Sequence, residues 1–309
     1  MNAPAVYTPR RPSTSRFEPI RGLRCHLRCW GDAGLVTPER PPLVMVHGWM
    51  DMSASFQFVV DALAAAEGFD RFVIAPDWRG FGLSQAPAAD SYWFPDYLAD
   101  LDAILDRLAP AGAVDLVGHS MGGNVAMHYA GVRPRRVRRL VNLEGFGMPA
   151  TRPTQAPQRL AQWLDELKAP QQLRPYASLD DVAARLMAND PLLPADKAAW
   201  LAPHWARPAA GGGFELQADP VHKRVNPVLY QVDEVLETWK LITAPLLWAE
   251  GDQTDTDKWW GHRYSRAEFH QRLAVVPGPV RKLVLSPCGH MLHHVQPEAL
   301  ARALADFLR

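Results

Sequence analysis

Short apolar runs alternate with stretches of helical periodicity along the chain, and this alternation narrows its possible folds more than any other feature. The runs are four or five residues long and rich in Val, Ile or Leu, as expected for parallel strands that are buried on both faces. They lie at 43–46, 71–75, 114–117, 140–143, 245–248 and 282–285. Apolar residues recur at helical spacing at 97–108 and 300–308. The pattern predicts an α/β protein with a mainly parallel sheet flanked by helices.

Two further stretches complete this organisation. Residues 24–30 alternate as an antiparallel edge strand would, with 16–20 as the expected partner strand. From 148 to 236 prolines interrupt short helical stretches and no strand pattern is present, which is too long for an ordinary loop. We therefore expect a core formed by 1–147 and 237–309, with 148–236 inserted as a helical cap. Gly211 to Gly213 would form a flexible turn within it.

The charge balance indicates no polyanionic partner. The 309 residues include 33 basic and 33 acidic side chains, so no overall field attracts nucleic acid or an anionic membrane. Five arginines lie within residues 133–139, where a helix is expected to end and a strand to begin. Cations at that place complement the helix dipole and stay solvated. We expect no nucleic-acid partner and no membrane partner, and the oligomeric state stays open.

The number of cysteines and the lengths of the apolar segments indicate the cellular compartment of the protein. Cys25, Cys29 and Cys288 are too few for a disulfide framework, which fits a reducing environment. The first 19 residues contain no apolar signal region, and no later segment has about 18 uninterrupted apolar residues. The sequence predicts a cytoplasmic protein.

Residues 118–122, Gly-His-Ser-Met-Gly, match the pattern Gly-x-Ser-x-Gly between a predicted strand and a predicted helix. The glycines allow a sharp turn that presents the Ser120 hydroxyl in a strained conformation at a helix N-terminus. There, free N–H groups favour developing negative charge. This context predicts that Ser120 is a nucleophile; the alternative is a tight turn whose serine only caps the helix.

A serine nucleophile requires a base and an acid that orients the base. His290 follows the last predicted strand and is the expected base, with His293 and His294 as competitors. The three histidines lack a nearby carboxylate, so no metal site is expected from them. Asp252, after the strand at 245–248, gives the order Ser, Asp, His expected for this topology and is the predicted acid. Glu144, after the preceding strand, is the alternative acid.

Taken together, these motifs resemble the α/β-hydrolase superfamily, and the resemblance covers about 16–147 and 237–309. The residues that carry it are His47-Gly48-Trp49, Asp77 to Ser84, Gly118 to Gly123, Asp252 and Gly289-His290. Residues 47–51, Ser55-Phe56 and 142–147 are similar to the serine hydrolase-like branch and to carboxylesterase-type members with a lid. The resemblance implies a mostly parallel eight-stranded sheet with the cap inserted after the sixth strand. It also implies an oxyanion hole made by the backbone N–H groups of Trp49 and Met121.

The expected chemistry is hydrolysis of a small to medium apolar carboxylic ester through an acyl-enzyme, a carboxylesterase-like activity of class EC 3.1.1, without cofactor or metal. Thioester, lactone, amide or carbon–carbon bond cleavage and cofactor-free perhydrolysis stay open, because a fold does not select among them. The other alternative is a ligand-binding protein without catalysis. Tryptophans in the insertion and the facing loops, Trp163, Trp200, Trp205, Trp49 and Trp78 among them, either line an apolar pocket or pack the cap.

Overall fold

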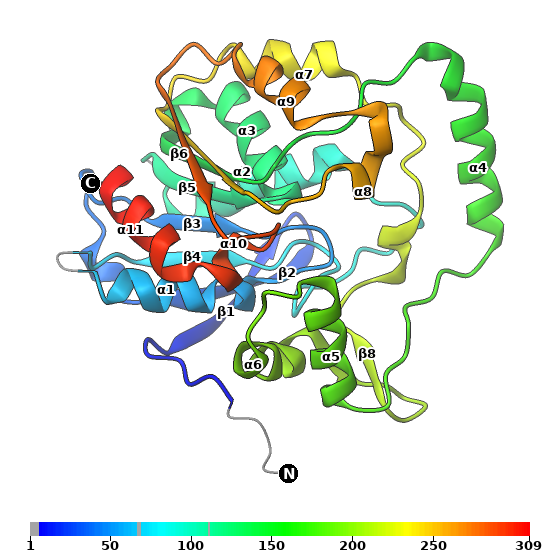
Figure 1. Ribbon diagram of the computed structural model, residues 1–309, viewed down its shortest axis with the longest axis horizontal. Helices are drawn as coiled ribbons and strands as arrows, with labels where there is room; N and C mark the ends of the chain where they lie inside the picture. The colour runs from blue at the N-terminus through cyan, green and yellow to red at the C-terminus, as the bar shows by residue number, and fades with distance from the viewer. Residues whose placement is uncertain (1–5, 67–68, 111) are drawn as a thin grey trace.

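The computed structural model describes residues 6–66, 69–110 and 112–309, and its centre is an eight-stranded sheet (Figure 1). The strand order is β1-β2-β4-β3-β5-β6-β9-β10. The strands are β1 (Ser13–Ile20), β2 (Leu23–Trp30), β3 (Leu43–Val46), β4 (Val73–Pro76), β5 (Val114–His119), β6 (Val137–Leu143), β9 (Leu246–Gly251) and β10 (Val280–Leu285). β3 to β6, β9 and β10 pair in parallel, whereas β2 pairs antiparallel with β1 and with β4. The predicted fold class is confirmed.

Helices cover both faces of this sheet. The helices of the core are α1 (Gln57–Ala64), α2 (Phe94–Leu108), α3 (Met121–Val132), α7 (Val232–Trp239), α8 (Asp257–Trp260), α9 (Arg266–Leu273), α10 (Leu292–Val295) and α11 (Pro297–Phe307). In β3, Val44 and Val46 belong to the core cluster that includes α2, α3 and α7. Leu43 and Met45 point to the other cluster, with α1 and α11. Because both faces are buried, the strand is apolar at every position.

The amino-terminal strands differ slightly from expectation. The stretch predicted as an edge strand is β2, which lies inside the sheet, and β1 takes the edge instead. β4 begins at Val73, two residues later than expected, and the Arg71 side chain before it donates hydrogen bonds to the Pro41 carbonyl and the Asp115 carboxylate, each at 2.6 Å.

Between β6 and α7 the chain contains three α-helices and a short hairpin. These elements are α4 (Ala156–Lys168), α5 (Leu179–Asn189), α6 (Ala195–Trp205), β7 (Ala206–Pro208) and β8 (Phe214–Leu216). The prediction that this segment has no strand is therefore wrong, although the glycine turn is where it was expected: Gly212 and Gly213 join β7 to β8 with φ of 90° and 70°. α5, α6 and the hairpin share an apolar cluster with Phe58 of α1. α4 stands apart from them (Figure 1). All residues of α4 are described, and none of them is buried.

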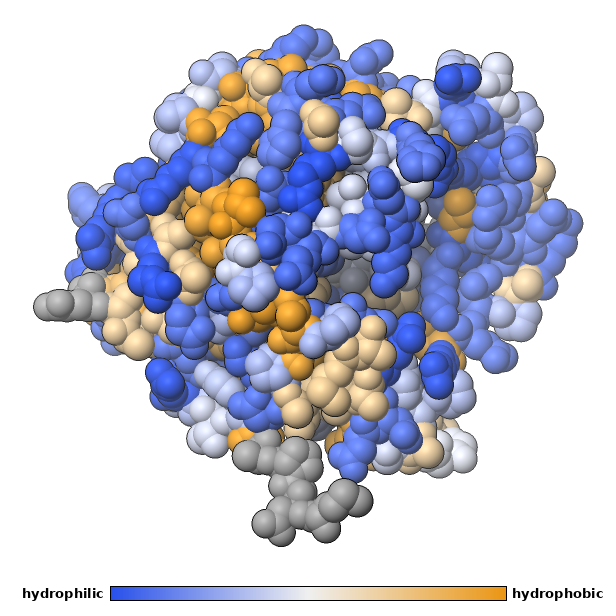
Figure 2. Space-filling view, in the orientation of Figure 1, coloured by the Kyte–Doolittle hydropathy of each residue, from blue (hydrophilic) through white to orange (hydrophobic). Residues whose placement is uncertain are grey.

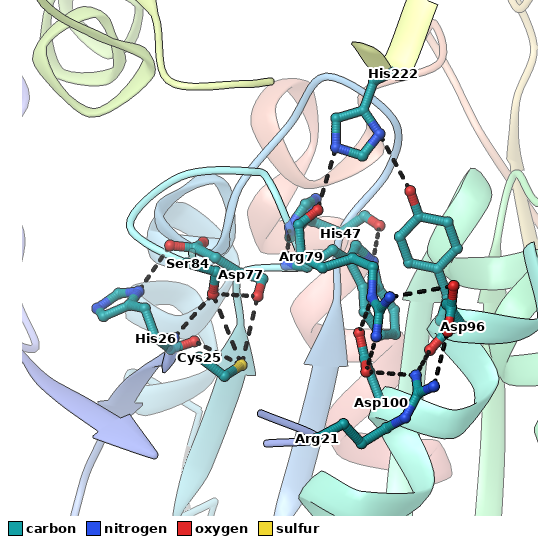
Figure 3. Close-up of polar contacts among 12 residues, drawn as sticks. Arg21, Cys25, His26, His47, Asp77, Arg79, Ser84, Asp96, Asp100 and His222 are labelled. Carbon is teal, nitrogen blue, oxygen red and sulfur yellow. Dashed lines mark hydrogen bonds and ion pairs between the residues drawn. The ribbon is translucent and has the colours of Figure 1, made fainter. Parts of the chain in front are cut away.

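His222 fastens this segment to the loop after β4 (Figure 3). Its ring is stacked between Phe81, with centroids 3.7 Å apart, and Tyr92, with centroids 3.5 Å apart. Nε2 lies 3.1 Å from the Arg79 carbonyl and Nδ1 lies 3.2 Å from the Tyr97 hydroxyl. Burial lowers the pKa of His222 to about 3, so the ring is neutral. Since a carbonyl only accepts, Nε2 donates to Arg79 and Nδ1 accepts from Tyr97.

The chain returns to the core through α7, so the boundary expected between 236 and 237 falls inside a helix. Trp239 of α7 is buried in the core, and α7 packs so closely on α3 that a Cβ at Gly131 would lie 2.0 Å from the Thr238 carbonyl oxygen. Thr151, near the beginning of the inserted segment, donates from Oγ1 to the carbonyl of Tyr230, just before α7, at 2.8 Å. The two ends of the inserted segment therefore meet.

The arginine run lies where the sequence placed it, between α3 and β6. Arg133, Arg136 and Arg138 form ion pairs with Asp102, Asp106 and Asp115 at 3.5, 3.2 and 2.5 Å. Within the described ranges, no helix combines the length and the apolar character needed to cross a bilayer.

Candidate active site

Ser120 occupies a strained turn between β5 and α3. Its φ is 53° and its ψ is −116°, a conformation that costs a non-glycine residue about 1–3 kcal/mol. The turn is tight enough to exclude side chains on both sides. A Cβ at Gly118 would lie 2.3 Å from the Gly122 carbonyl oxygen, and a Cβ at Gly122 would lie 2.3 Å from the Val46 carbonyl oxygen. The Ser120 N–H donates to the Leu143 carbonyl at 2.8 Å, which ties the turn to the end of β6.

His290 lies in the loop between β10 and α10. Its Nδ1 is 2.7 Å from Oε2 of Glu144, and its backbone carbonyl accepts a hydrogen bond from His119 Nε2 at 2.9 Å. His119 immediately precedes Ser120, so this bond joins the histidine loop to the serine turn. The ring edge of Trp259 from α8 contacts His290, with ring centroids 4.6 Å apart. Among the described residues no hydrogen bond joins Ser120 to His290, and such bonds often shorten only when substrate binds.

Glu144 is the carboxylate that orients His290. It directly follows β6, is 1% exposed, and has a left-handed backbone with φ of 59°. Oε1 accepts from the Gly251 N–H at 2.6 Å, and the Thr254 hydroxyl lies 2.9 Å from both carboxylate oxygens. These contacts fix the carboxylate against Nδ1, which leaves Nε2 of His290 for proton transfer.

Asp252, the predicted acid, lies elsewhere. It is exposed, and it accepts from the Ser286 hydroxyl at 2.7 Å and from the Cys288 N–H at 2.9 Å. These two bonds lower the pKa of Asp252. The structure thus pairs His290 with the alternative acid, Glu144, and not with Asp252. The physical reason is that β9 continues to Gly251, so Asp252 is the first residue after the strand and its side chain contacts the loop after β10 instead of His290.

The loop that contains Trp49 lies against the serine turn. A Cβ at Gly48 would lie 3.1 Å from Ser120 Cβ, and Met121 is the first residue of α3. His47 holds this loop: burial lowers its pKa, its Nε2 accepts from the Trp78 N–H at 2.9 Å, and its Nδ1 donates to the Gly48 carbonyl at 2.8 Å. Gly48 therefore lies against Ser120, and the two expected oxyanion-hole residues, Trp49 and Met121, directly follow Gly48 and Ser120 in the chain.

Comparison with known proteins identifies the family of this chain. A family model described as alpha/beta hydrolase fold matches residues 41–297. The chain belongs to the alpha/beta hydrolase fold family. It is 26% identical to the serine hydrolase-like protein of Danio rerio over 98% of this chain and 90% of that protein. It is 39% identical to a 2-hydroxy-6-oxo-2,4-heptadienoate hydrolase of Pseudomonas putida, over 35% of this chain and 38% of that enzyme.

A solved structure of the same hydrolase fold covers nearly the whole chain. The thioesterase domain from the curacin biosynthetic pathway superposes with a TM-score of 0.79 at 26% identity, covering 95% of this chain and 99% of that one.

Two residues near the candidate site of this alpha/beta hydrolase were not predicted from the sequence. Thr254 was not identified as a partner of Glu144, although its place in the polar loop after a strand end was a usable signal. Asp190, which caps the end of α5, reaches the histidine loop: a Cβ at Gly289 would lie 4.0 Å from its Oδ1. Burial raises the pKa of Asp190. The inserted segment therefore places a carboxyl group beside His290.

The tryptophans of the hydrolase differ in burial, and Trp163, Trp200 and Trp205 of the inserted segment are partly buried. Trp78, Trp239 and Trp248 are fully buried and pack the core, whereas Trp49 is 52% exposed and Trp259 is 40% exposed. Figure 2 shows the surface hollowed in the region between α4, α5 and α8. Trp259 belongs to α8, one of the helices around this hollow, and contacts His290.

Proposed function

We propose that the protein is a serine hydrolase in which Ser120, His290 and Glu144 form the catalytic triad. The observation that carries this proposal is the contact between His290 Nδ1 and Glu144 Oε2, in a protein that holds Ser120 in a strained strand-to-helix turn. The contact fixes the ring tautomer, because Nδ1 must donate to the carboxylate and Nε2 is left as the base.

The reaction begins when Ser120 Oγ attacks the substrate carbonyl carbon and His290 Nε2 takes the hydroxyl proton. Glu144 stabilises the imidazolium that forms. The N–H groups of Trp49 and Met121 stabilise the oxyanion, and each such donor typically contributes about 3–4 kcal/mol at the barrier. His290 then gives its proton to the departing alcohol, which leaves an acyl-enzyme. Water, deprotonated by the same nitrogen, releases the carboxylic acid and restores Ser120.

The proposed substrate is a small to medium apolar carboxylic ester, and the inserted segment from 148 to α7 serves as the cap. Trp259 beside His290 and the exposed Trp49 beside Ser120 offer aromatic surface to an apolar acyl or alcohol group. Asp190 supplies a polar group from the cap side. These features favour a neutral substrate that is apolar over most of its surface.

Cytoplasmic residence is part of the same proposal. Cys25, Cys29 and Cys288 are all free and buried, which suits a reducing compartment.

A fluorophosphonate probe tests the proposal directly. The wild type is expected to be labelled covalently, and Ser120→Ala, with an unchanged circular dichroism spectrum, is expected to stay unlabelled. Failure of the folded wild type to react would instead favour a ligand-binding protein without catalysis. A panel of p-nitrophenyl esters from two to twelve carbons then ranks acyl length.

The names of similar proteins add a second set of substrates to this panel. The curacin domain is named as a thioesterase, and the Pseudomonas relative is named as a hydrolase of 2-hydroxy-6-oxo-2,4-heptadienoate. Thioesters, lactones and a vinylogous diketone therefore belong beside the esters. The class with the highest kcat/KM identifies the bond that this triad cleaves.

A further inference from the structure

Behind the serine turn lies a second polar cluster that the proposed triad does not use. It consists of Asp51, His119 and His293, which are 3%, 2% and 0% exposed. One possible ligand atom from each residue lies within 4.8 Å of the other two. Asp51 Oδ2 is 4.0 Å from His119 Nδ1 and 3.8 Å from His293 Nε2. Three buried groups of this kind are costly to leave without partners.

Three polar atoms of the cluster have no hydrogen-bond partner among the residues described: His119 Nδ1, Asp51 Oδ1 and His293 Nδ1. The other ring nitrogen of His119, Nε2, donates to the His290 carbonyl, because a carbonyl only accepts.

Ser55 does not supply these partners. Its hydroxyl lies 3.0 Å from Asp51 Oδ2, 2.7 Å from His293 Nε2 and 2.6 Å from His294 Nε2. The hydroxyl has one proton, so it donates to only one of these three groups. The described part of the chain places no Lys or Arg in contact with the buried Asp51 carboxylate.

We propose that Asp51, His119 and His293 form a site for a divalent transition-metal ion of the Zn²⁺ type. Two imidazoles and one carboxylate are a common donor set for this ion, with water in the fourth position. Bonds of about 2.0 Å place tetrahedral ligands about 3.3 Å apart, so the separations of 3.8 and 4.0 Å between Asp51 and the two histidines must shorten by several tenths of an ångström. His293 Nε2 must also exchange its contact with the Ser55 hydroxyl, at 2.7 Å, for the ion.

Occupancy of this site would inhibit the hydrolase, a consequence that rests on the proposed function. His119 precedes Ser120 in the chain and holds the His290 carbonyl through Nε2. A metal ion that draws Nδ1 of this ring inward therefore shifts both the nucleophile and the base. Misplacement by about 1 Å can reduce a rate about a hundredfold.

Metal binding is tested without activity. Chelator-treated protein is dialysed against Zn²⁺, and Co²⁺ is added separately to record its visible absorption. We expect one tight ion per chain in the wild type, in Ser120→Ala and in His290→Gln, and at least tenfold weaker binding in Asp51→Asn and His293→Gln. Loss of the ion in His290→Gln would place it at the exposed catalytic surface and overturn the proposal, as would a wild type that binds no ion.

A second measurement covers the case in which the cluster variants do not fold. X-ray absorption of the zinc-loaded wild type is expected to show two imidazoles and only nitrogen or oxygen ligands; sulfur ligation or a single imidazole overturns the assignment. For inhibition, Zn²⁺ is expected to slow fluorophosphonate labelling of the wild type at least tenfold, and that of folded His293→Gln less than twofold. If the wild type binds zinc through Asp51 but is never labelled, the metal site stands and the hydrolase function fails.

Discussion

The Nδ1 atom of His290 lies 2.7 Å from Oε2 of Glu144, a carboxylate that leaves the end of β6 through a left-handed backbone conformation. The same carboxylate accepts from the Gly251 N–H at the end of β9. Neighbouring strand ends thus jointly hold the group that orients the base. The histidine loop, which follows β10, is the third contributor.

Exchanging the two candidate acids for their amides separates their roles. Glu144→Gln is expected to lower kcat on a p-nitrophenyl ester by about 10³–10⁴, because the amide no longer fixes the tautomer or stabilises the imidazolium. Asp252→Asn loses only contacts with Ser286 and Cys288 and is expected to change kcat less than tenfold. Steady-state kinetics of both variants checks this. A larger loss of kcat in Asp252→Asn than in Glu144→Gln would show that Asp252, not Glu144, is the acid of the triad.

The contrast between these two acids shows how far the sequence could go. Ser120 and His290 were predicted because each lies in a local motif at a strand end. The acid depends on how far β9 continues and on the φ of 59° at Glu144, and neither is visible in residue patterns. β7 and β8 were missed because three-residue strands beside Pro208 are too short to alternate. The proposed metal site joins Asp51 to His293, residues far apart in sequence that only the folded chain brings together.

Gly122 tests the steric demands of the serine turn. A methyl group there meets the Val46 carbonyl oxygen at 2.3 Å, and the turn cannot move away because Ser120 is bonded to Leu143. We expect Gly122→Ala to lower the free energy of unfolding by about 1–3 kcal/mol or more. At Gly211 a methyl group meets no described atom within 4 Å, so Gly211→Ala is expected to stay within about 0.5 kcal/mol of wild type. Urea unfolding of both variants provides the comparison.

His222 should make stability depend on pH. Its pKa is about 3 in the folded protein and 6.5 for a free side chain, so the unfolded chain gains a proton first as pH falls. The contribution of His222 is thus complete above pH 6.5 and declines between pH 6.5 and 3. From pH 7 to pH 5 this amounts to about 2 kcal/mol. We expect the loss in unfolding free energy over that interval to be smaller in His222→Gln than in wild type.

Tyr97→Phe is the matched control for this measurement, because it removes the hydroxyl that contacts His222 Nδ1 but keeps the titrating ring. It is expected to retain a pH dependence close to that of wild type, although at lower overall stability. An equal pH dependence in wild type and His222→Gln would contradict the assignment of a neutral, buried ring.

The three cysteines should be inert in the native protein. Burial raises the pKa of Cys25 and of Cys288 to about 12 and that of Cys29 to about 11, so almost no thiolate forms at pH 8. Ellman's reagent is expected to titrate all three thiols in guanidinium chloride and fewer than one within an hour in native buffer. Fluorophosphonate labelling should survive pretreatment with iodoacetamide. Rapid modification of Cys288 with loss of labelling would show that the histidine loop opens.

The hydrogen bond between Thr151 and Tyr230 has a consequence for how this protein can change. Because the two ends of the inserted segment already lie side by side, a replacement of different length can begin and end there without stretching the sheet. Ser120, Glu144 and His290 all lie outside that segment. The proposed catalytic triad can therefore persist while the residues of the segment, which are proposed to select the substrate, are exchanged. A new substrate specificity then requires only a new inserted segment between the same two ends, while the core of the enzyme is kept.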